Sequence, residues 1–216
     1  MKTLALIVRK PGLSRESFRA HYEELHAPLA LPLMSGLLRY VRQHVHEELH
    51  GAAGFDVMTS FTYRDAAAMQ HVIARLAGPA GDAILRDELT FMDKPRNRFF
   101  EVREASETGA RAADAPFTCI VFVKHASGRG AGDLAAEFAS RALPALRDSA
   151  PGLRWCLHQT ALGSFGEPPW DAVTQLHADA VGDLAAWCLE REREGARALL
   201  VRVSEHASAI SPGGVA

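Results

Sequence analysis

The side chains best suited to acid–base chemistry lie in the first half of the chain. Tyr40, Arg42, His44 and His46 alternate along a β-like segment, so on a strand they share one face. His26 precedes them in a segment with helical spacing. A histidine can take or give a proton near neutral pH, and a tyrosine hydroxyl can donate to a carbonyl oxygen. We therefore expect a polar pocket in a barrel, in which His26, Tyr40 and His44 are catalytic and Arg42 binds the ligand.

A structural role is the alternative for each of these residues. His26 could interact with the dipole at the C-terminal end of its helix without doing chemistry. The polar strand face could instead be solvated, above all at its far end near His46. The pattern His44-x-His46 with His50 also resembles metal ligands, but no carboxylate at a firm spacing completes the set, and we expect neither a metal nor another cofactor.

The elements that carry these residues follow the order β-α-β-β-α-β. A helix is expected after the N-cap Ser14, with a core stripe of Phe18, Tyr22, Leu25 and Leu29 and an end at Pro28 and Pro32. Tyr22 is expected to line the ligand site. The other expected elements are strands at 3–8, 37–46, 55–63 and 98–103 and a helix at 65–76.

The same elements recur in the second half. Leu38-Arg39-Tyr40 matches Leu153-Arg154-Trp155 at an offset of 115 (155 − 40), and the segments beginning at Thr3 and Phe55 match at the same offset. The second set of expected elements comprises strands at 117–124, 153–160, 170–177 and 198–204 and helices at 133–147 and 181–193. The expected organisation is one repeat at 1–103, a linker at 104–114, a second repeat at 115–208 and a tail at 209–216.

Two ferredoxin-like βαββαβ units have helices on only one face of each sheet, so the open faces must be buried elsewhere. We therefore predict an α+β fold in which the tandem units close on each other as an intramolecular, pseudo-dimeric barrel. A further homodimer of such chains is compatible with the sequence.

The two copies differ where chemistry is expected. The second copy replaces the polar strand residues by Trp155, Leu157, Gln159 and Ala161, and has Arg141 and Ala142 near the place of His26. It is predicted to be a non-catalytic wall. Asp56 and Asp171 occur in both copies, which favours a structural role for them.

The first copy also carries an insert at about 77–95 that the second copy lacks. It contains Asp87, Phe91 and Asp93. Long insertions in compact domains are often functional. Phe91 is expected to cover a hydrophobic ligand, with ordinary core packing as the alternative.

The first half resembles the EthD family of the dimeric α+β barrel superfamily. The resemblance rests on Lys10-Pro-Gly-Leu-Ser-Arg-Glu-Ser-Phe18, His26-Ala-Pro28, Gly36-Leu-Leu-Arg-Tyr40 and the segment 87–100. It covers about residues 1–103, and the second half would be a degenerate copy. It implies the fold strongly and the reaction weakly, because relatives include isomerases, cyclases, dehydratases, monooxygenases and haem-processing enzymes. In this family and its isomerase relatives a histidine such as His26 often lines the pocket.

The composition of the chain bears on which partners it can bind and on the state of its cysteines. The net charge is −2, so no basic field attracts nucleic acid or an anionic membrane. The apolar run at 4–8 is too short for a membrane span. Cys119, Cys156 and Cys188 are odd in number and widely spaced, which is typical of reduced thiols in a cytoplasmic protein.

Three functions are compatible with these patterns. One is a cofactor-independent isomerase, cyclase or dehydratase acting on a small cyclic or aromatic-derived compound in a degradative or secondary-metabolite pathway, with cofactor-independent oxygenation a further variant. Another is a non-catalytic protein that binds a small hydrophobic molecule for a partner oxygenase. The third is a haem-handling protein. A paired acid and base in the site would favour the enzyme, and an apolar site would favour the binding protein.

Overall fold

The structure is a computed structural model that describes residues 1–108, 117–125, 136–137, 140–141, 144, 154–161, 165–177 and 182–209. Over these residues it is an α+β fold with eight strands, which confirms the predicted class. The chain divides into two compact units, which are described separately. The first contains Met1–His44, Gly54–Phe99 and the C-terminal residues from His206, and the second contains Val45–Ala53 and Phe100–Glu205.

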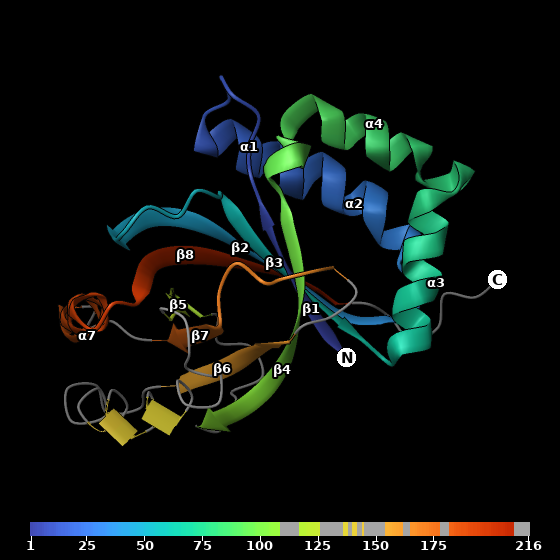
Figure 1. The fold of residues 1–216 in the computed structure, drawn as a ribbon. Coiled ribbons are helices and arrows are strands. Elements are labelled where there is room, and N and C mark those ends of the chain that lie inside the picture. The colour runs from blue at the N-terminus through green and yellow to red at the C-terminus, as the bar shows by residue number, and fades with distance from the viewer. Residues whose placement is uncertain are drawn as a thin grey trace. The chain divides into compact units, whose positions relative to one another are not determined.

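The first unit is built from strands with helices packed beside them (Figure 1). Its elements, some of which run on into the second unit, are β1 (Lys2–Ile7), α1 (Arg15–His21), the π-helical η1 (Tyr22–His26), α2 (Ala27–Ala30), η2 (Leu31–Leu33), β2 (Leu37–His50), β3 (Val57–Tyr63), α3 (Ala66–Ala77), η3 (Pro79–Gly81), α4 (Asp82–Phe91), η4 (Lys94–Arg96) and β4 (Arg98–Thr108). β3 pairs antiparallel with both β1 and β2.

Two predicted helix starts are confirmed by their caps. The Ser14 hydroxyl accepts a hydrogen bond from the backbone N–H of Ser17, and the Asp65 carboxylate accepts one from that of Ala68. Each cap satisfies a backbone donor that has no partner within its helix.

The predicted end of the first helix at Pro28 and Pro32 is wrong. The chain stays helical through Leu33, because each proline occupies the first or second position of a new short helix. At these positions a proline N–H is not needed by the helix, so the ring does not interrupt it.

The predicted core stripe also fails beyond Tyr22. Leu25 is 58% exposed and Leu29 is 40% exposed, whereas His26 and Ala30 are buried. The π-helical turn of η1 widens the spacing of residues on one side, so the buried stripe advances four residues at a time. This shift brings His26 into the interior.

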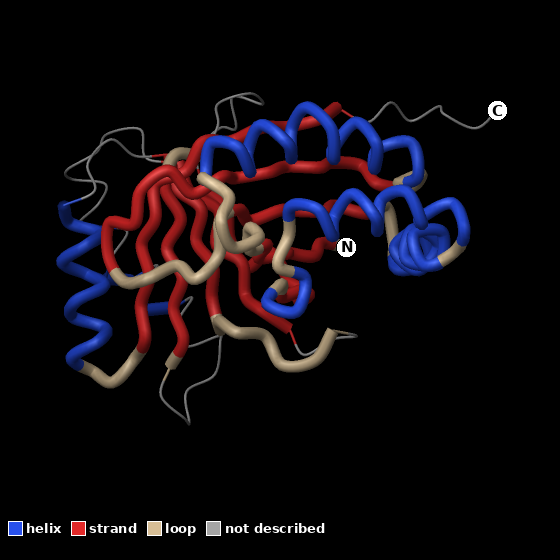
Figure 2. Tube along the Cα trace, turned by 90° about the horizontal axis from the view of Figure 1, so that it is seen from above, coloured by secondary structure: helices blue, strands red, loops and turns tan. Residues whose placement is uncertain are grey.

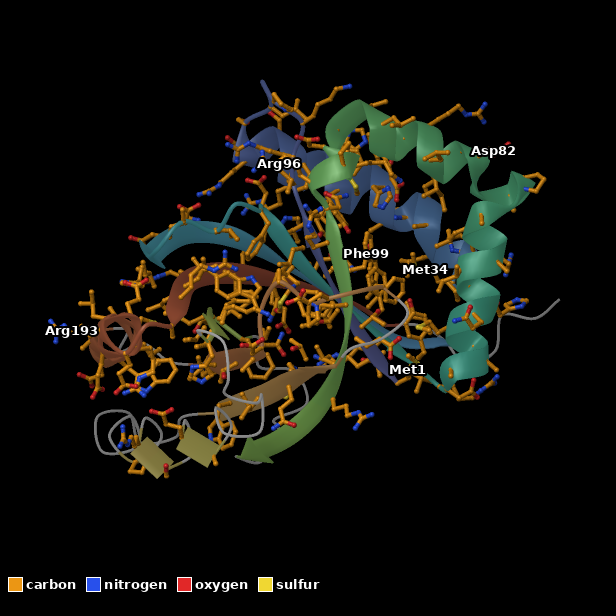
Figure 3. All side chains as sticks on the ribbon, viewed as in Figure 1. Met1, Met34, Asp82, Arg96, Phe99 and Arg193 are labelled. Carbon is orange, nitrogen blue, oxygen red and sulfur yellow. The ribbon has the colours of Figure 1, made fainter. Side chains whose placement is uncertain are left out.

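The core of the first unit lies between its strands and helices. It is an apolar cluster that includes Phe18, Tyr22, Tyr40, Phe91 and Met34, the last of which is labelled in Figure 3. Burial of these side chains provides the main driving force for packing α1, η1 and α4 together.

The second unit contains the remaining strands and one described long helix. Its elements are β5 (Cys119–Lys124), β6 (Arg154–Ala161), β7 (Ala172–His177), α7 (Gly182–Arg193) and β8 (Arg197–Ala209), whose last residues belong to the first unit. The antiparallel pairs run in the order β8-β5-β7-β6-β4. α7, the helix at the left edge of Figure 2, packs on these strands through Leu184, Trp187 and Cys188.

Several predicted boundaries differ from the structure. β4 continues through 104–108, where a linker was expected to begin, and the insert at 77–95 contains the helix α4. Of the predicted linker, residues 109–114 lie outside the described residues, as do most of the predicted helix 133–147 and the tail after 209.

Candidate functional site

His26 lies at the end of η1 and is paired with a carboxylate of α4. Its Nδ1 is 2.8 Å from Oδ2 of Asp87, and its side chain is 5% exposed. With the carboxylate as acceptor, Nδ1 carries the ring proton, which leaves Nε2 as the free base. Burial lowers the pKa of His26, and the hydrogen bond to Asp87 opposes this only in part. The imidazole is therefore neutral at neutral pH, as a general base must be.

Asp87 is shared with a second, more exposed histidine. Nε2 of His21 lies 2.7 Å from Oδ1 of Asp87, so the carboxylate bridges two imidazoles. The ring of Phe91 stacks on His21 at a centroid distance of 4.2 Å and packs beside His26 at 5.2 Å. The first-half insert thus supplies both the carboxylate and the ring that hold His26 in place.

A second histidine–carboxylate pair joins η1 to β2. Nε2 of His44 lies 2.6 Å from Oε1 of Glu23. Arg42 donates to the same carboxylate through Nε, at 2.9 and 3.0 Å, and through Nη2, at 2.7 Å. Burial alone would raise the pKa of Glu23, but the hydrogen bonds from His44 and Arg42 outweigh it and lower the pKa to about 2. Glu23 is therefore a carboxylate at any working pH.

The ionised Glu23 fixes the tautomer of His44. Because a carboxylate only accepts, Nε2 of His44 carries the proton and Nδ1 keeps its lone pair. Nδ1 is buried and has no hydrogen-bond partner in the described part of the chain. Burial lowers the pKa of His44, with the Glu23 interaction opposing it. This imidazole too is a neutral base with one nitrogen available.

Two tyrosines and a threonine form a hydrogen-bonded chain in the same interior. The Tyr40 hydroxyl donates to the Tyr22 hydroxyl at 3.4 Å, and the Tyr22 hydroxyl lies 3.1 Å from Oγ1 of Thr59. Burial raises the pKa of Tyr22 and raises that of Tyr40 well above its usual value. Both phenols therefore stay protonated and can act as donors.

Tyr22 stands between the two histidines. Its ring meets the His26 ring edge-to-face at 5.0 Å and the His44 ring edge-to-face at 5.6 Å. The structure thus brings together the six residues predicted to form the site. These are His26, Tyr40, His44, Arg42, Tyr22 and Phe91, each 4% exposed or less. His46, which was expected to be peripheral, is exposed.

The predicted direction of the strand face is wrong. Tyr40, Arg42 and His44 contact Tyr22 and Glu23 of the helical segment, whereas we expected them to point inside a barrel away from the helices. Polar partners on η1 make this face compatible with helix packing, because each of these three side chains forms a hydrogen bond there.

Sequence reasoning missed the carboxylates that complete both pairs. Asp87 was noted only as part of the insert, and its restriction to the first predicted copy was the signal that could have found it. Glu23 had no such signal, because its partners lie on another element. The predicted structural role of Asp56 fits its contacts with Arg9 and Arg15, which join the ends of β1 and α1 to the start of β3.

In the second unit the residues predicted to correspond to Tyr40 and Arg42 are apolar. Trp155 and Leu157 lie in the core cluster that packs against α7. On the alternate positions of β6, the fully buried His158 bonds through Nε2 to Oε1 of Gln175 at 3.0 Å and lies 3.4 Å from Sγ of Cys156. This polar pair was not foreseen. Of the predicted counterparts of His26, Arg141 is exposed and Ala142 lies outside the described residues.

In the part of the chain that the structure describes, no group of three or more His, Cys, Asp or Glu side chains is arranged to hold a metal ion. The three cysteines are buried and form no disulfide. None of the helices in the described ranges is long and apolar enough to cross a membrane.

The fold of the chain is shared with solved structures of low sequence identity. An anthrone oxidase-like protein has 12% identity and a TM-score of 0.64, with 100% of this chain and 95% of the other covered. A monooxygenase-like protein from Lactobacillus acidophilus has 12% identity and a TM-score of 0.54, with coverage of 97% and 96%. A chlorite dismutase-like protein has 11% identity and a TM-score of 0.51, with coverage of 94% of each chain. At such identities the likeness establishes the fold alone.

Sequence comparison relates the first half of the chain to one protein family. No curated protein matches the sequence of the chain. The model of the EthD domain matches residues 10–95, a segment that contains His26, Glu23, Tyr40, His44 and Asp87. The resemblance to the EthD family is therefore confirmed for residues 10–95.

Proposed function

We propose that this protein is a cofactor-independent enzyme that moves a proton on a small cyclic or aromatic-derived compound, in an isomerisation, cyclisation or dehydration. The observation that carries the proposal is the placement of two buried histidine–carboxylate pairs on either side of Tyr22. Such reactions remove a proton at one position and return one at another, so they need a base and an acid in one site.

His26 serves as the general base. Asp87 holds the proton on Nδ1, so the lone pair of Nε2 is available for a C–H or O–H proton of the substrate. The carboxylate also stabilises the imidazolium that forms when the proton is taken up. Once protonated on Nε2, His26 then acts as the general acid that returns the proton at the second position and becomes neutral again. His44 has the same design through Glu23, with Nδ1 as the available nitrogen, and can carry out the same two steps.

The tyrosine hydroxyls stabilise the charge that develops on the substrate. Removing a proton beside a carbonyl places negative charge on the carbonyl oxygen. Tyr22 and Tyr40 are protonated donors in a buried site, where hydrogen bonds to a developing oxyanion are strongest. Thr59 can accept from or donate to Tyr22 and so adapts to its orientation.

The charges of the site favour an uncharged substrate. Arg42 is the buried cation among the described residues of the first unit, and its guanidinium is already bonded to Glu23, Tyr40 O and Ser208. It therefore has little left to offer a carboxylate group. Glu23 and Asp87 add negative charge, so a neutral ketone or phenol fits better than an anion.

The test is exchange of substrate protons with solvent. The full chain would be incubated in D₂O with a panel of neutral cyclic ketones and polyphenols, and deuterium incorporation followed by NMR. Incorporation that requires His26 supports the enzyme. Binding of a compound without exchange or turnover would contradict it and support the non-catalytic binding protein. An absorbance band of haem in the purified protein would instead support the haem-handling function.

The same proposal includes the architecture predicted from the repeat, two ferredoxin-like units closing within one chain as a barrel. It is supported by the strand order β8-β5-β7-β6 in the second half and by the shared pairing of the first, third and second strands in both halves. At low protein concentration, sedimentation should show a fully folded monomer of 23.4 kDa. A chain that folds only as a dimer would contradict this architecture.

A further inference from the structure

The end of the last strand reaches the His44–Glu23 pair. The side chains assigned above to the two histidine–carboxylate pairs and the tyrosine chain fall within residues 10–95, the segment that matches the EthD domain. His206 and Ser208, on β8, come from the far end of the sequence, yet they belong to the same compact unit and contact this cluster. We propose that His206 and Ser208 are positioning residues for the His44–Glu23 pair. This inference rests on the proposed function only for its effect on turnover.

Ser208 completes the bonding of Arg42. Nε and Nη2 of the guanidinium are used by Glu23, and Nη1 donates to Oγ of Ser208 at 2.9 Å. The other acceptor of Nη1 is the backbone oxygen of Tyr40, at a longer 3.4 Å. Because the guanidinium is planar, a short hydrogen bond at Nη1 also fixes the direction in which Nε and Nη2 donate to Glu23. Ser208 therefore acts on His44 through Arg42 and Glu23.

His206 borders the same pair from the solvent side. Its ring meets the His44 ring edge-to-face at 5.5 Å, and its Nδ1 lies 3.9 Å from Oε2 of Glu23. The His206 side chain is 43% exposed and that of His44 is 4% exposed. The outer ring thus limits the rotation of the inner ring and covers one edge of the carboxylate.

Titratable and charged groups face His44 from each element that packs on it. Tyr22 and Glu23 lie on η1, Arg42 lies on the same strand as His44, and His206 lies on β8. Glu23 favours protonation of His44, while Arg42 and His206 oppose it. A change at His206 or Ser208 must therefore appear in the titration of His44 if these residues position the pair.

The experiment uses the full chain with ¹⁵N-labelled histidine and needs no substrate. NMR would record the tautomer and titration of His44 in the wild type, Ser208→Ala, Ser208→Thr and His206→Gln. The control variant is His46→Gln, because His46 is exposed and lies on β2, the strand that carries His44. We expect Ser208→Ala to reduce the Nε2–H population of His44 and Ser208→Thr to restore it. His206→Gln should raise the midpoint of His44 by about 0.5 pH unit, because the Coulombic interaction with His206, which lowers the pKa of His44, is lost. The control should match the wild type.

Turnover provides the second measurement. With a substrate that passes the exchange test, Ser208→Ala should lower kcat by about 10-fold with little change in KM, as loss of a supporting hydrogen bond typically does. His44 signals that are identical in Ser208→Ala, His206→Gln and the wild type would overturn the proposal. If Ser208→Ala melts early, His206→Gln still decides the outcome. Altered His44 signals in a protein without turnover on any substrate would refute the proposed function and leave the positioning role standing.

Discussion

Oδ2 of Asp87 lies 2.8 Å from Nδ1 of His26, although 61 positions separate the two residues in the sequence. The contact joins the π-helical turn η1 to the helix α4 of the insert. It gives a buried imidazole a fixed tautomer and a nearby negative charge, which are what a general base needs.

Replacing Asp87 by asparagine tests this relationship. The amide N–H₂ can donate to Nδ1 of His26, which would move the ring proton to Nε2 and remove the base. We expect turnover to fall by about 10²–10⁴-fold while ligand binding persists. Asp82→Asn, at the exposed start of α4 labelled in Figure 3, is the matched control and should keep its activity. Equal activity in both variants would argue against the pair.

Replacing His26 by glutamine should remove activity but keep the fold. Helical structure continues beyond His26 into α2, so its role is not that of a charge at the helix end. Glutamine can still bond Asp87, and the remaining loss of packing should cost about 1–3 kcal/mol in the free energy of unfolding. For a chain of this size that lowers Tm by several degrees. A variant with a lower Tm but full turnover would show that His26 is structural.

The change Tyr40→Phe isolates one hydroxyl. The ring keeps its stacking on Phe61 at 5.2 Å and its position under the Arg42 guanidinium at 4.5 Å. The lost bond to Tyr22 should cost about 1 kcal/mol of stability. If the hydroxyl chain stabilises an oxyanion, kcat should fall by about 10²–10³-fold. The companion Tyr63→Phe, whose hydroxyl lies outside this chain of bonds, should leave kcat unchanged.

Stability should fall with acid in two separate windows. His26 and His44 have folded pKa values below the 6.5 of free histidine, so between those values and 6.5 the unfolded chain binds more protons. The stability that the two neutral histidines contribute is fully present above pH 6.5, and it is lost as the pH falls through their pKa values in the folded protein. Glu23, whose pKa is lowered from 4.5 to about 2, causes a second loss of stability as the pH falls between these two values.

Thermal melting across pH checks both windows. Wild-type Tm should decline below pH 6.5 and again below 4.5, and His44→Gln should flatten the first decline. Glu23→Gln should weaken the second. A Tm that is constant from pH 7 to 5 would contradict the neutral, buried state of the two histidines.

Local patterns in the sequence were sufficient to predict much of the first half. Apolar periodicity and the N-cap Ser14 predicted the order of its elements, because helix starts and strand faces depend on neighbouring residues. The alternation of Tyr40, Arg42 and His44 likewise predicted that they share a face. These inferences needed no knowledge of which elements pack together.

The partners of those residues were decided by tertiary structure. The π-helical turn of η1 moved Leu25 out and His26 in, and no residue pattern marks the insertion of one residue in a helical turn. Packing of α4 against η1 then brought Asp87 to His26, and packing of η1 on β2 brought Glu23 to His44. Carboxylates that are distant in the sequence can reach a buried imidazole only when the helices have packed. The site gains its chemistry at that step, because each pair fixes a tautomer and shifts a pKa only in the dry interior.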